Sequence, residues 1–447
     1  MHAENAFKGV KQGQMFMNPR FLFYVYKLRR NIGLSSSELS RLQFKQLKIM
    51  LKHAYDDVPF YHRKFRNAKI KPDDIETIDD LDKVPITTKS ELQSSALSDI
   101  VAVDSNPDKC ITRMTSGSTG MPLTLVADAK TVDFELALWT RTFLANGVRP
   151  WDKIGVLTDP KNFPRSGKLT QRLGISRRNY VSIFDGPEKQ EKILEACNVD
   201  VIKGYPTSLA LLAEHCKLDA CKIRPRLIFT AAELLSRASR ISIASAFGGE
   251  LLDNYACIEF GLLSWECSEH MGYHINADSV ILQAVRKGET VARGERGEIV
   301  CTSLVNHAMP LIRYKIGDVG VLSDESCSCG RALPLMKIVE GRTGDFLMAT
   351  DGRAVSPIIF FPYPFESLEG IKQFRVVQEK RNKLIIQLVL RENFKLDPSL
   401  CGKATSELQK VFGEDMQVEF QVLKELATDS AKLRKIISNI PVDYREH

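Results

Sequence analysis

The spacing of apolar and polar residues predicts a helical region over the first hundred residues. Within residues 42–55, the apolar positions recur with a largely helical period. The patterns Ser35-x-x-Glu38 and Thr88-x-x-Glu91 are capping boxes, and each predicts the start of a helix. The segment Val58-Pro59-Phe60-Tyr61 predicts a turn that ends the first long helix.

From residue 110 to residue 330, short apolar runs alternate with helical stretches. The expected strands are Lys153–Leu157, Asp200–Lys203, Arg226–Thr230, Glu250–Tyr255, Ser279–Val285, Gly297–Thr302 and Met309–Tyr314. The expected helices are Lys130–Asn146, Pro187–Ala196, Pro206–Leu218 and Arg237–Phe247. Alternation of this kind predicts an α/β fold with a sheet that is at least partly parallel.

After about residue 346 the pattern predicts a small α+β unit. Its expected strands are Phe374–Gln378, Leu384–Leu390 and Val418–Val422, with a helix over Gly402–Phe412. The Gly-rich and charged segment Gly341–Asp345 is a candidate hinge. We therefore predict two domains: a large N-terminal α/β domain with mixed sheets over residues 1–343, and a mobile C-terminal lid over 344–447.

Composition narrows the class of protein. The 447 residues are 44% hydrophobic and 26% charged, which excludes collagen-like, low-complexity and wholly disordered chains. No apolar run is long enough for a transmembrane helix, and the run Phe21–Tyr26 is too short for a signal-peptide core, so we expect a cytoplasmic protein. The mild net charge of +7 gives no reason to expect a nucleic-acid partner. For the basic segment Lys27–Arg30, a solvated helix end is the simpler interpretation and a membrane contact is the alternative.

The ten cysteines divide into two groups. A disulfide framework is not expected in a reducing compartment. Seven cysteines stand alone in apolar or mixed segments and are interpreted as core residues: Cys110, Cys197, Cys216, Cys221, Cys257, Cys301 and Cys401. The other three, Cys267, Cys327 and Cys329, form with His274 a Cys₃His set typical of a tetrahedral structural zinc site. His270 is the alternative to His274, and unrelated free cysteines are the alternative to a metal site.

The segment Thr115–Pro122 (TSGSTGMP) is a candidate phosphate-binding loop. Its alternating hydroxyls and glycines allow backbone N–H groups to approach an anion closely. It is not a Walker A loop, because no Gly-Lys-Ser/Thr follows. Strand-like runs on both sides, Ile111–Met114 and Leu123–Ala127, predict a tight hairpin. A flexible linker is the alternative interpretation.

This loop and five further motifs in order resemble the adenylate-forming superfamily of acyl-CoA synthetases. The resemblance implies that the loop binds the phosphates of ATP through Thr115, Ser116, Gly117, Ser118, Thr119 and Gly120. It implies an adenine pocket made by Ala231, Ala232 and Glu233 and by a stacking Tyr255, with Glu259 holding Mg²⁺.

Three later motifs carry the rest of the resemblance. The segment Arg313–Asp318 implies that Asp318 binds the ribose hydroxyls. Within Gly341–Asp345, the resemblance implies that Arg342 contacts the ribose or phosphate and that Asp345 is a candidate pivot. The segment Ser430–Lys435 implies a catalytic lysine, Lys432, with Lys435 as the alternative, so the expected catalytic residues are Lys432, Glu259 and Thr119.

Within the superfamily, the chain resembles the phenylacetate–CoA ligase and capsular-polysaccharide-biosynthesis (CapK-like) branch. The segments that carry this are 58–61, 81–85, 204–208 and 327–331. The resemblance implies activation of a carboxylic acid by ATP and Mg²⁺ with release of pyrophosphate, followed by transfer to a thiol, expected to be coenzyme A. It also implies a zinc-binding Cys/His set, and an acid pocket lined by the 139–145, 182–186, 204–208 and 231–233 regions.

Three alternatives stay open. The acyl group could pass to an amine or hydroxyl acceptor in polysaccharide biosynthesis, or the chain could be a non-catalytic scaffold of the same fold. A homodimer is left open beside a monomer.

Overall fold

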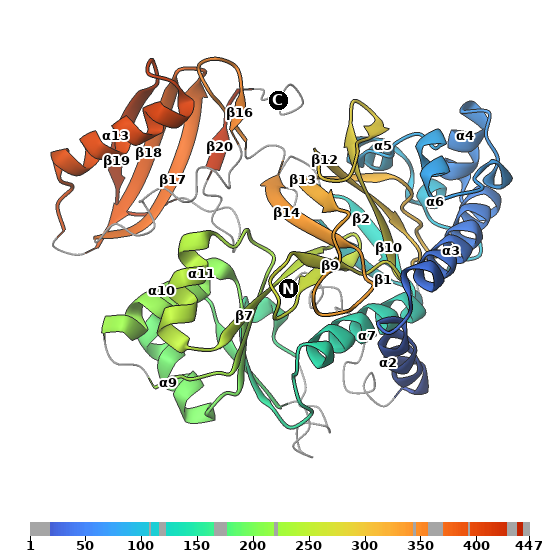
Figure 1. The fold of residues 1–447 in the computed structure, drawn as a ribbon, viewed down its shortest axis with the longest axis horizontal. Helices are drawn as coiled ribbons and strands as arrows, with labels where there is room; N and C mark the ends of the chain where they lie inside the picture. Colours follow the sequence, from blue (N-terminus) through green and yellow to red (C-terminus); the bar gives the residue numbers. More distant parts are fainter. Residues whose placement is uncertain are drawn as a thin grey trace. The chain divides into compact units, whose positions relative to one another are not determined.

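The computed structural model describes nine stretches of the chain: residues 18–106, 109–115, 122–164, 177–218, 222–342, 346–355, 370–391, 394–426 and 436–440. Side chains are described within these stretches except at 218, 338–342 and 354. The chain forms two compact units (Figure 1). The larger comprises Met1–Glu233, Ile243–Ile316 and Gly320–Ile338; the smaller comprises Leu234–Ser242, Gly317–Val319 and Val339–His447.

The N-terminal part of the larger unit is helical, as predicted. Its α-helices are α2 (Pro19–Asn31), α3 (Ser36–Asp57), α4 (Pro59–Asn67), α5 (Lys89–Ser94) and α6 (Leu97–Ile100), with short 3₁₀ helices at Pro72–Asp74 and Asp79–Lys83. Both predicted capping boxes are confirmed, at Ser35 with Glu38 and at Thr88 with Glu91. The predicted end of the long helix at Val58 is confirmed, since α3 ends at Asp57, but the break is a single extended residue because Pro59 opens α4. Proline favours the first helical position, where its missing N–H costs nothing.

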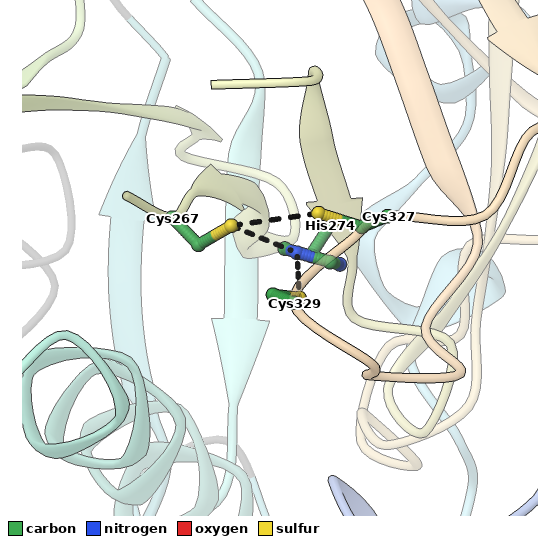
Figure 2. A group of neighbouring side chains, drawn as sticks. All are labelled: Cys267, His274, Cys327 and Cys329. Atoms are coloured by element: carbon green, nitrogen blue, oxygen red, sulfur yellow. Dashed lines mark hydrogen bonds between the residues drawn. The ribbon is translucent and has the colours of Figure 1, made fainter. Parts of the chain in front are cut away.

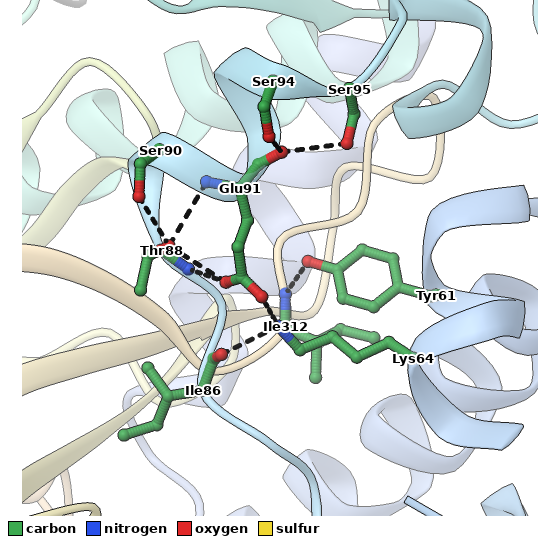
Figure 3. Close-up of polar contacts among 9 residues, drawn as sticks. All are labelled: Tyr61, Lys64, Ile86, Thr88, Ser90, Glu91, Ser94, Ser95 and Ile312. Atoms are coloured by element: carbon green, nitrogen blue, oxygen red, sulfur yellow. Dashed lines mark hydrogen bonds and ion pairs between the residues drawn. The ribbon is translucent and has the colours of Figure 1, made fainter. Parts of the chain in front are cut away.

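A set of polar contacts joins α4 to α5 and to the segment that precedes β13 (Tyr314–Ser323) (Figure 3). The Glu91 carboxylate accepts from the Thr88 backbone N–H at 2.7 Å and from Lys64 Nζ at 2.9 Å. The Tyr61 hydroxyl lies 2.8 Å from the backbone N of Ile312 and accepts its hydrogen bond. Burial raises the pKa of Tyr61 to about 12, so this hydroxyl stays neutral at any physiological pH.

A twelve-stranded sheet forms the centre of the fold. Its strands are β3 (Lys153–Thr158), β4 (Arg177–Ser182), β5 (Val201–Gly204), β6 (Leu227–Ala231), β7 (Glu250–Cys257), β8 (Gly261–Glu266), β9 (Tyr273–Ile275), β10 (Val280–Arg286), β11 (Glu289–Thr290), β12 (Arg296–Ser303), β13 (Tyr314–Ser323) and β14 (Leu335–Arg342). The strand order is β11-β10-β12-β13-β14-β9-β8-β7-β6-β5-β3-β4. From β4 to β7 neighbouring strands pair in parallel, whereas β7–β8 and β8–β9 are antiparallel. This mixed sheet confirms the predicted α/β class.

Helices cover both faces of the parallel half. These are α7 (Ala129–Ala145), α9 (Pro187–Cys197), α10 (Pro206–Leu218) and α11 (Arg237–Phe247). A Cβ on Gly204 would meet Leu209 of α10 at 3.0 Å, so α10 packs on the face to which Gly204 points. The neighbouring Lys203 points to the opposite face, which α7 covers. The four predicted helices are therefore confirmed to within one residue.

One predicted strand, Met309–Tyr314, is wrong. The strand β13 begins only at Tyr314, and the residues before it form a buried irregular segment. Leu311 and Ile312 are apolar because they fill the core under the N-terminal helices. The Ile312 N–H is satisfied by Tyr61, and Arg313 has a positive φ of 45°, which lies outside the extended region of a regular strand.

The smaller unit has its own sheet and core. The sheet has the order β19-β18-β17-β20, and a two-stranded sheet pairs β15 with β16. The elements are β15 (Leu347–Met348), β16 (Ala354–Val355), β17 (Ile371–Lys380), β18 (Lys383–Leu390), α13 (Pro398–Phe412), β19 (Gln417–Leu423) and β20 (Ile436–Ser438). The three predicted strands and the helix are confirmed, although α13 begins four residues earlier than expected. Leu408 and Phe412 of α13 pack with Ile386 and Leu388 of β18 in one core.

None of the helices in the described stretches combines the length and the apolar character needed to cross a bilayer.

Candidate nucleotide and metal sites

The candidate phosphate loop grows out of a confirmed hairpin. Strands β1 (Ile111–Met114) and β2 (Thr124–Ala127) are antiparallel, with Met114 opposite Thr124. The Leu123 N–H donates to Thr115 Oγ1 at 2.9 Å, and the Thr115 N–H donates to the Leu123 carbonyl at 3.0 Å. This double contact joins the two ends of the loop. The other predicted phosphate ligands, Ser116, Gly117, Ser118, Thr119 and Gly120, lie outside the described residues.

A buried ion pair ties the hairpin to α7. The Arg113 guanidinium donates to both carboxylate oxygens of Glu135, at 3.1 and 2.7 Å. This bidentate geometry fixes orientation as well as distance. Glu135 also packs against the turn after β7, since a Cβ on Gly261 would lie 3.5 Å from Glu135 Cγ. The Glu135 side chain is therefore bonded to the loop hairpin through Arg113 and lies beside the first residue of β8, which follows the turn that carries Glu259.

Sequence reasoning missed this pair. The available signal was an acidic residue inside the otherwise apolar stretch of α7 around Phe134 and Leu136. Glu135 and Arg113 are 7% and 6% exposed, and buried charges of opposite sign require each other.

The candidate adenine site lies at the carboxyl ends of two parallel strands. Strands β6 and β7 are in register, with Ala231 opposite Asn254, so Tyr255 follows directly beside Ala232. Glu259 lies in the turn after β7. The structure thus brings Ala231–Glu233, Tyr255 and Glu259 to one edge, which is where open α/β sheets bind ligands.

The backbone at this edge is held in an unusual shape. Ala232 has a positive φ of 74°, which is uncommon for a residue with a side chain. The Glu233 carboxylate accepts from the backbone N–H of Thr207 at 3.0 Å. This contact ties the end of β6 to the start of α10 and positions the segment predicted to line the adenine pocket.

A buried lysine lies near the carboxyl end of β5, the strand next to β6. Lys203, near the end of β5, is 6% exposed, and its Nζ lies 4.5 Å from the Trp139 ring centroid and 5.4 Å from that of Phe143. Both rings belong to α7. Sequence reasoning treated Lys203 as an ordinary strand residue. The signal was a lysine at the end of an apolar strand that precedes the 204–208 segment.

The remaining predicted nucleotide ligands are less closely defined. Asp318 lies on β13 and is 6% exposed. The backbone of Arg342 ends β14, and its side chain is not among those described. Asp345 and Lys432, with the alternative Lys435, lie outside the described residues. The roles of these residues stay predictions.

Arg313, at the start of the Asp318 motif, has a structural role. Its guanidinium donates to the carbonyls of Asp82 and Val84 at 2.9 and 2.7 Å and lies 3.0 Å from the Asp82 carboxylate. The contacts hold the 81–85 segment against the strand that carries Asp318. Burial lowers the pKa of Arg313, and the Asp82 carboxylate opposes that shift.

The four predicted metal ligands come together (Figure 2). The ligand atoms of Cys267, His274, Cys327 and Cys329 all lie within 4.8 Å of one another. Cys267 follows β8, His274 lies in β9, and the other two lie in the turn between β13 and β14. The imidazole and the sulfurs of Cys267 and Cys327 are buried.

The distances in this cluster fit a tetrahedral ion. His274 Nε2 lies 3.3 Å from the sulfurs of both Cys267 and Cys329, and the Cys267 and Cys327 sulfurs are 3.7 Å apart. Ideal tetrahedral bonds of about 2.3 Å to sulfur and 2.0 Å to nitrogen place sulfurs about 3.8 Å apart and sulfur about 3.5 Å from nitrogen. The described donor set therefore has the dimensions of a four-ligand zinc centre.

The alternative ligand His270 lies elsewhere. Its ring nitrogens are 3.8 and 3.9 Å from the carboxylates of Glu250 and Glu266. Its φ of 49° belongs to the turn between Cys267 and His274.

Local electrostatics favour the neutral forms of Cys267, His274 and Cys327 but not of Cys329. Burial raises the pKa of the Cys267 thiol to about 12, and burial with the nearby Arg331 lowers the pKa of His274 to about 4. Burial also raises the pKa of Cys327, whereas backbone groups and Arg331 outweigh burial and lower the pKa of Cys329. A bound dication inverts this balance, since it favours the thiolate and leaves the imidazole neutral.

Neighbouring side chains fix the turn that carries Cys327 and Cys329. The Ser328 hydroxyl donates to the Glu269 carboxylate at 2.6 Å, which links the two ligand loops directly. Arg331 donates to the carbonyl of Ala145 at 3.0 Å and lies over the Trp265 ring at 5.4 Å. Contacts of this kind orient the side chains of the cluster.

The other cysteines only partly follow the prediction. Cys216, Cys257 and Cys301 are buried as expected, but Cys110, Cys197 and Cys401 are only half-buried. These three lie at element ends or on a helix side, where one face of the thiol meets water. Cys221 lies outside the described residues. The nine described cysteines are all free thiols, so none of them forms a disulfide.

Comparison with known proteins identifies the family. Residues 347–439 match the CapK C-terminal domain. Phenylacetate-coenzyme A ligase of Escherichia coli (strain K12) is 32% identical over 328 residues, which cover 70% of this chain and 73% of that protein. The chain belongs to the phenylacetate-coenzyme A ligase family. Protein CapK of Staphylococcus aureus is 22% identical over 449 residues, covering 96% of this chain and 95% of that protein.

Solved structures confirm the predicted fold. A 2-hydroxyisobutyryl-CoA ligase in the postadenylation state, in complex with R3-HIB-AMP, matches with a TM-score of 0.75 at 19% identity, covering 92% of this chain and 91% of that chain. An anthranilate CoA ligase in complex with anthranoyl-AMP matches with a TM-score of 0.57 at 16% identity, covering 73% and 65%. The fold is therefore the one that these CoA ligase structures share.

Proposed function

We propose that this chain is an AMP-forming acid–CoA ligase that works in the cytoplasm. The observation that carries the proposal is the shared edge of β6 and β7. There, Ala231–Glu233, Tyr255 and Glu259 lie at neighbouring strand ends, and Glu135, which Arg113 bonds to the loop hairpin, lies beside the residue that follows the Glu259 turn. A nucleotide bound at this edge would reach both the turn and the loop.

In the first step, a carboxylate oxygen of the acid attacks the α-phosphorus of ATP, and pyrophosphate leaves with the electron pair of the broken P–O bond. Tyr255 stacks on adenine, while Asp318 and Arg342 hold the ribose. Backbone N–H groups of the 115–120 loop, with Thr119, bind the departing phosphates. Mg²⁺ held by Glu259 supplies charge neutralisation when bound, and Lys432 stabilises the charge that develops at the α-phosphate.

In the second step, the thiolate of coenzyme A attacks the acyl carbon, and AMP leaves as the C–O bond breaks. Lys432 belongs to the C-terminal lid of residues 344–447, so it must withdraw before the thiol approaches. We propose that the lid rotates about Gly341–Asp345, with Asp345 as pivot, and so presents a different face to the body of residues 1–343.

The test separates the two steps. We expect Lys432→Ala to abolish ATP–pyrophosphate exchange while largely preserving thiolysis of a supplied acyl-adenylate. Lys435→Ala is the matched control and should retain both. Equal loss of both half-reactions in Lys432→Ala would contradict the assigned role, and exchange lost only in Lys435→Ala would transfer that role to Lys435.

We further propose that Cys267, His274, Cys327 and Cys329 hold a structural zinc ion. The support is the tetrahedral spacing of the four donor atoms. Four protein ligands leave no position open to water, so the ion would stabilise the fold and take no part in the chemistry. It would clamp the β8–β9 hairpin to the turn between β13 and β14.

Metal analysis tests the zinc proposal. We expect about one zinc per chain in the purified protein, and its loss in Cys327→Ser/Cys329→Ser. Cys401→Ser removes a thiol of the smaller unit and should keep the metal. A wild-type protein that is fully folded without metal would contradict the proposal.

A second candidate function uses the same adenylate with a different acceptor. The near full-length match to Protein CapK and the CapK C-terminal domain favour transfer to an amine or hydroxyl group in surface-polysaccharide biosynthesis. AMP release without coenzyme A, but with such an acceptor present, would select it. If the chain fails to bind ATP at all, a non-catalytic scaffold becomes the better proposal.

A further inference from the structure

The helix α2 is anchored to the larger unit by its inner face. Its buried residues are Phe21, Leu28 and Asn31, and α7 lies alongside it (Figure 1). Asn18 Nδ2 and Arg20 Nε donate to the Asp133 carboxylate of α7 at 2.8 and 2.6 Å. These contacts determine which face of α2 is turned outward.

The outward face of α2 is apolar and aromatic. Leu22, Phe23 and Tyr26 are 56%, 59% and 62% exposed. At about 100° per residue, the three side chains fall within an arc of about 100° on two successive turns. Large apolar side chains on a surface are common singly, but a continuous group on one helix face marks an interaction surface.

The same arc ends in two exposed arginines. Arg29 and Arg30 occupy the last turn of α2, and the Arg30 guanidinium lies 6.0 Å above the Tyr26 ring. The sequence contains no Asp or Glu from residue 5 to residue 37, so no acid within that stretch offsets these charges. Arg20 points its charge at Asp133 and is not part of the outward face.

We propose that this face of α2, defined by Leu22, Phe23, Tyr26, Arg29 and Arg30, docks on an anionic membrane surface. The aliphatic and aromatic groups can enter the region between headgroups and acyl chains, where tyrosine and phenylalanine are favoured. The arginines then reach lipid phosphates, which accept bidentate hydrogen bonds. A second copy of the chain fits less well, because a twofold contact on this face would bring the arginine pairs of two copies together.

Vesicle sedimentation tests the proposal on the full chain. The protein is mixed with vesicles of phosphatidylcholine alone or of phosphatidylcholine and phosphatidylglycerol in equal parts, at low and high salt. We expect binding to the anionic vesicles only, weakened by salt. Arg29→Gln/Arg30→Gln should bind about thirtyfold more weakly, since each basic residue near such a surface contributes about fivefold.

Matched variants keep the result interpretable. Phe23→Ser/Tyr26→Ser should also lose binding, whereas Trp151→Ser, which removes a 67% exposed aromatic residue elsewhere, should not. The melting temperature should be unchanged in these two variants and in Arg29→Gln/Arg30→Gln, which would exclude misfolding as the cause of lost binding. Equal binding to neutral vesicles, or equal binding by wild type and the α2 variants, would overturn the proposal. Dimerisation that Phe23→Ser/Tyr26→Ser abolishes, without vesicle binding by the wild type, would assign the face to a second copy instead.

Discussion

The buried Arg113–Glu135 pair permits a prediction that separates stability from nucleotide binding. Both side chains are less than a tenth exposed, so Glu135→Gln leaves a buried guanidinium without its counter-charge. Removing one partner of a buried pair costs about 3–5 kcal/mol of the free energy of unfolding. Replacing both, as Arg113→Met/Glu135→Leu, keeps similar volume without buried charge and should restore most of that loss.

Activity should not recover with stability. The bidentate contact orients the hairpin that carries the 115–120 loop, and Glu135 packs beside the turn that carries Glu259. An apolar pair fills the space but does not fix this orientation. We therefore expect the double variant to fold well and to show an increased KM for ATP in pyrophosphate exchange, with little change in the KM for the acid.

Denaturant unfolding and exchange kinetics on the same preparations provide the measurement. The control is the exposed pair Lys52–Asp56, 2.7 Å apart on α3, whose disruption should change the free energy of unfolding far less, because water screens both charges. If Glu135→Gln costs no more than Asp56→Asn, the pair is not the buried interaction described here. If the double variant has normal ATP kinetics, the pair stabilises the fold without positioning the loop.

Three further outcomes are expected. Tyr61→Phe leaves the buried N–H of Ile312 without its acceptor and should cost about 1–3 kcal/mol in denaturant unfolding; a neutral result would contradict the contact. For Glu91, burial opposes the charge, but Lys64 and the helix cap outweigh it and hold its pKa below the ordinary 4.5, so the stability it adds is present above pH 4.5 and lost as pH falls through the lower folded value. The melting-temperature difference between wild type and Glu91→Gln should therefore shrink at acid pH, and a constant difference would argue against the ionised cap. Lys203 lies beside Trp139 and Phe143, in the 139–145 region expected to line the acid pocket. Lys203→Met should therefore shift acid preference in a pyrophosphate-release panel by about tenfold toward purely apolar acids, with the KM for ATP unchanged, and an unchanged order of acids would show that Lys203 does not contact the acid.

Local sequence chemistry was sufficient for most elements. The capping boxes at Ser35 and Thr88 begin helices because their reciprocal hydrogen bonds are local, and the parallel strands are apolar because both faces are buried. The Cys₃His set could be predicted because thiols and imidazoles have few uses at such positions. The four side chains come together only because β14 pairs with β9, and no local sequence pattern predicts that pairing.

The failures share a tertiary cause. The run 309–314 is largely apolar because it is buried, as a core strand would be. Its Ile312 packs against the N-terminal helices, and its backbone N–H bonds to Tyr61 of α4 instead of to a neighbouring strand. Strand β8 was not predicted, although it lies between the predicted β7 and the His274 strand, because it is buried along its whole length and lacks alternation. The Arg113–Glu135 pair and Lys203 acquire meaning only from side chains that the fold brings to them.

The order of strands in the large sheet has a consequence for biosynthesis. Strand β9 lies between β8, its neighbour in sequence, and β14, which is made about 60 residues later. Until residue 336 has left the ribosome, β9 has one free edge. Until residue 329 has left it, Cys267 and His274 lack the two thiols of the later turn. Such an edge is prone to wrong pairing during synthesis. The proposed metal ion could bind all four ligands only late in synthesis. Metal uptake would therefore indicate that the turn before β14 has reached β9.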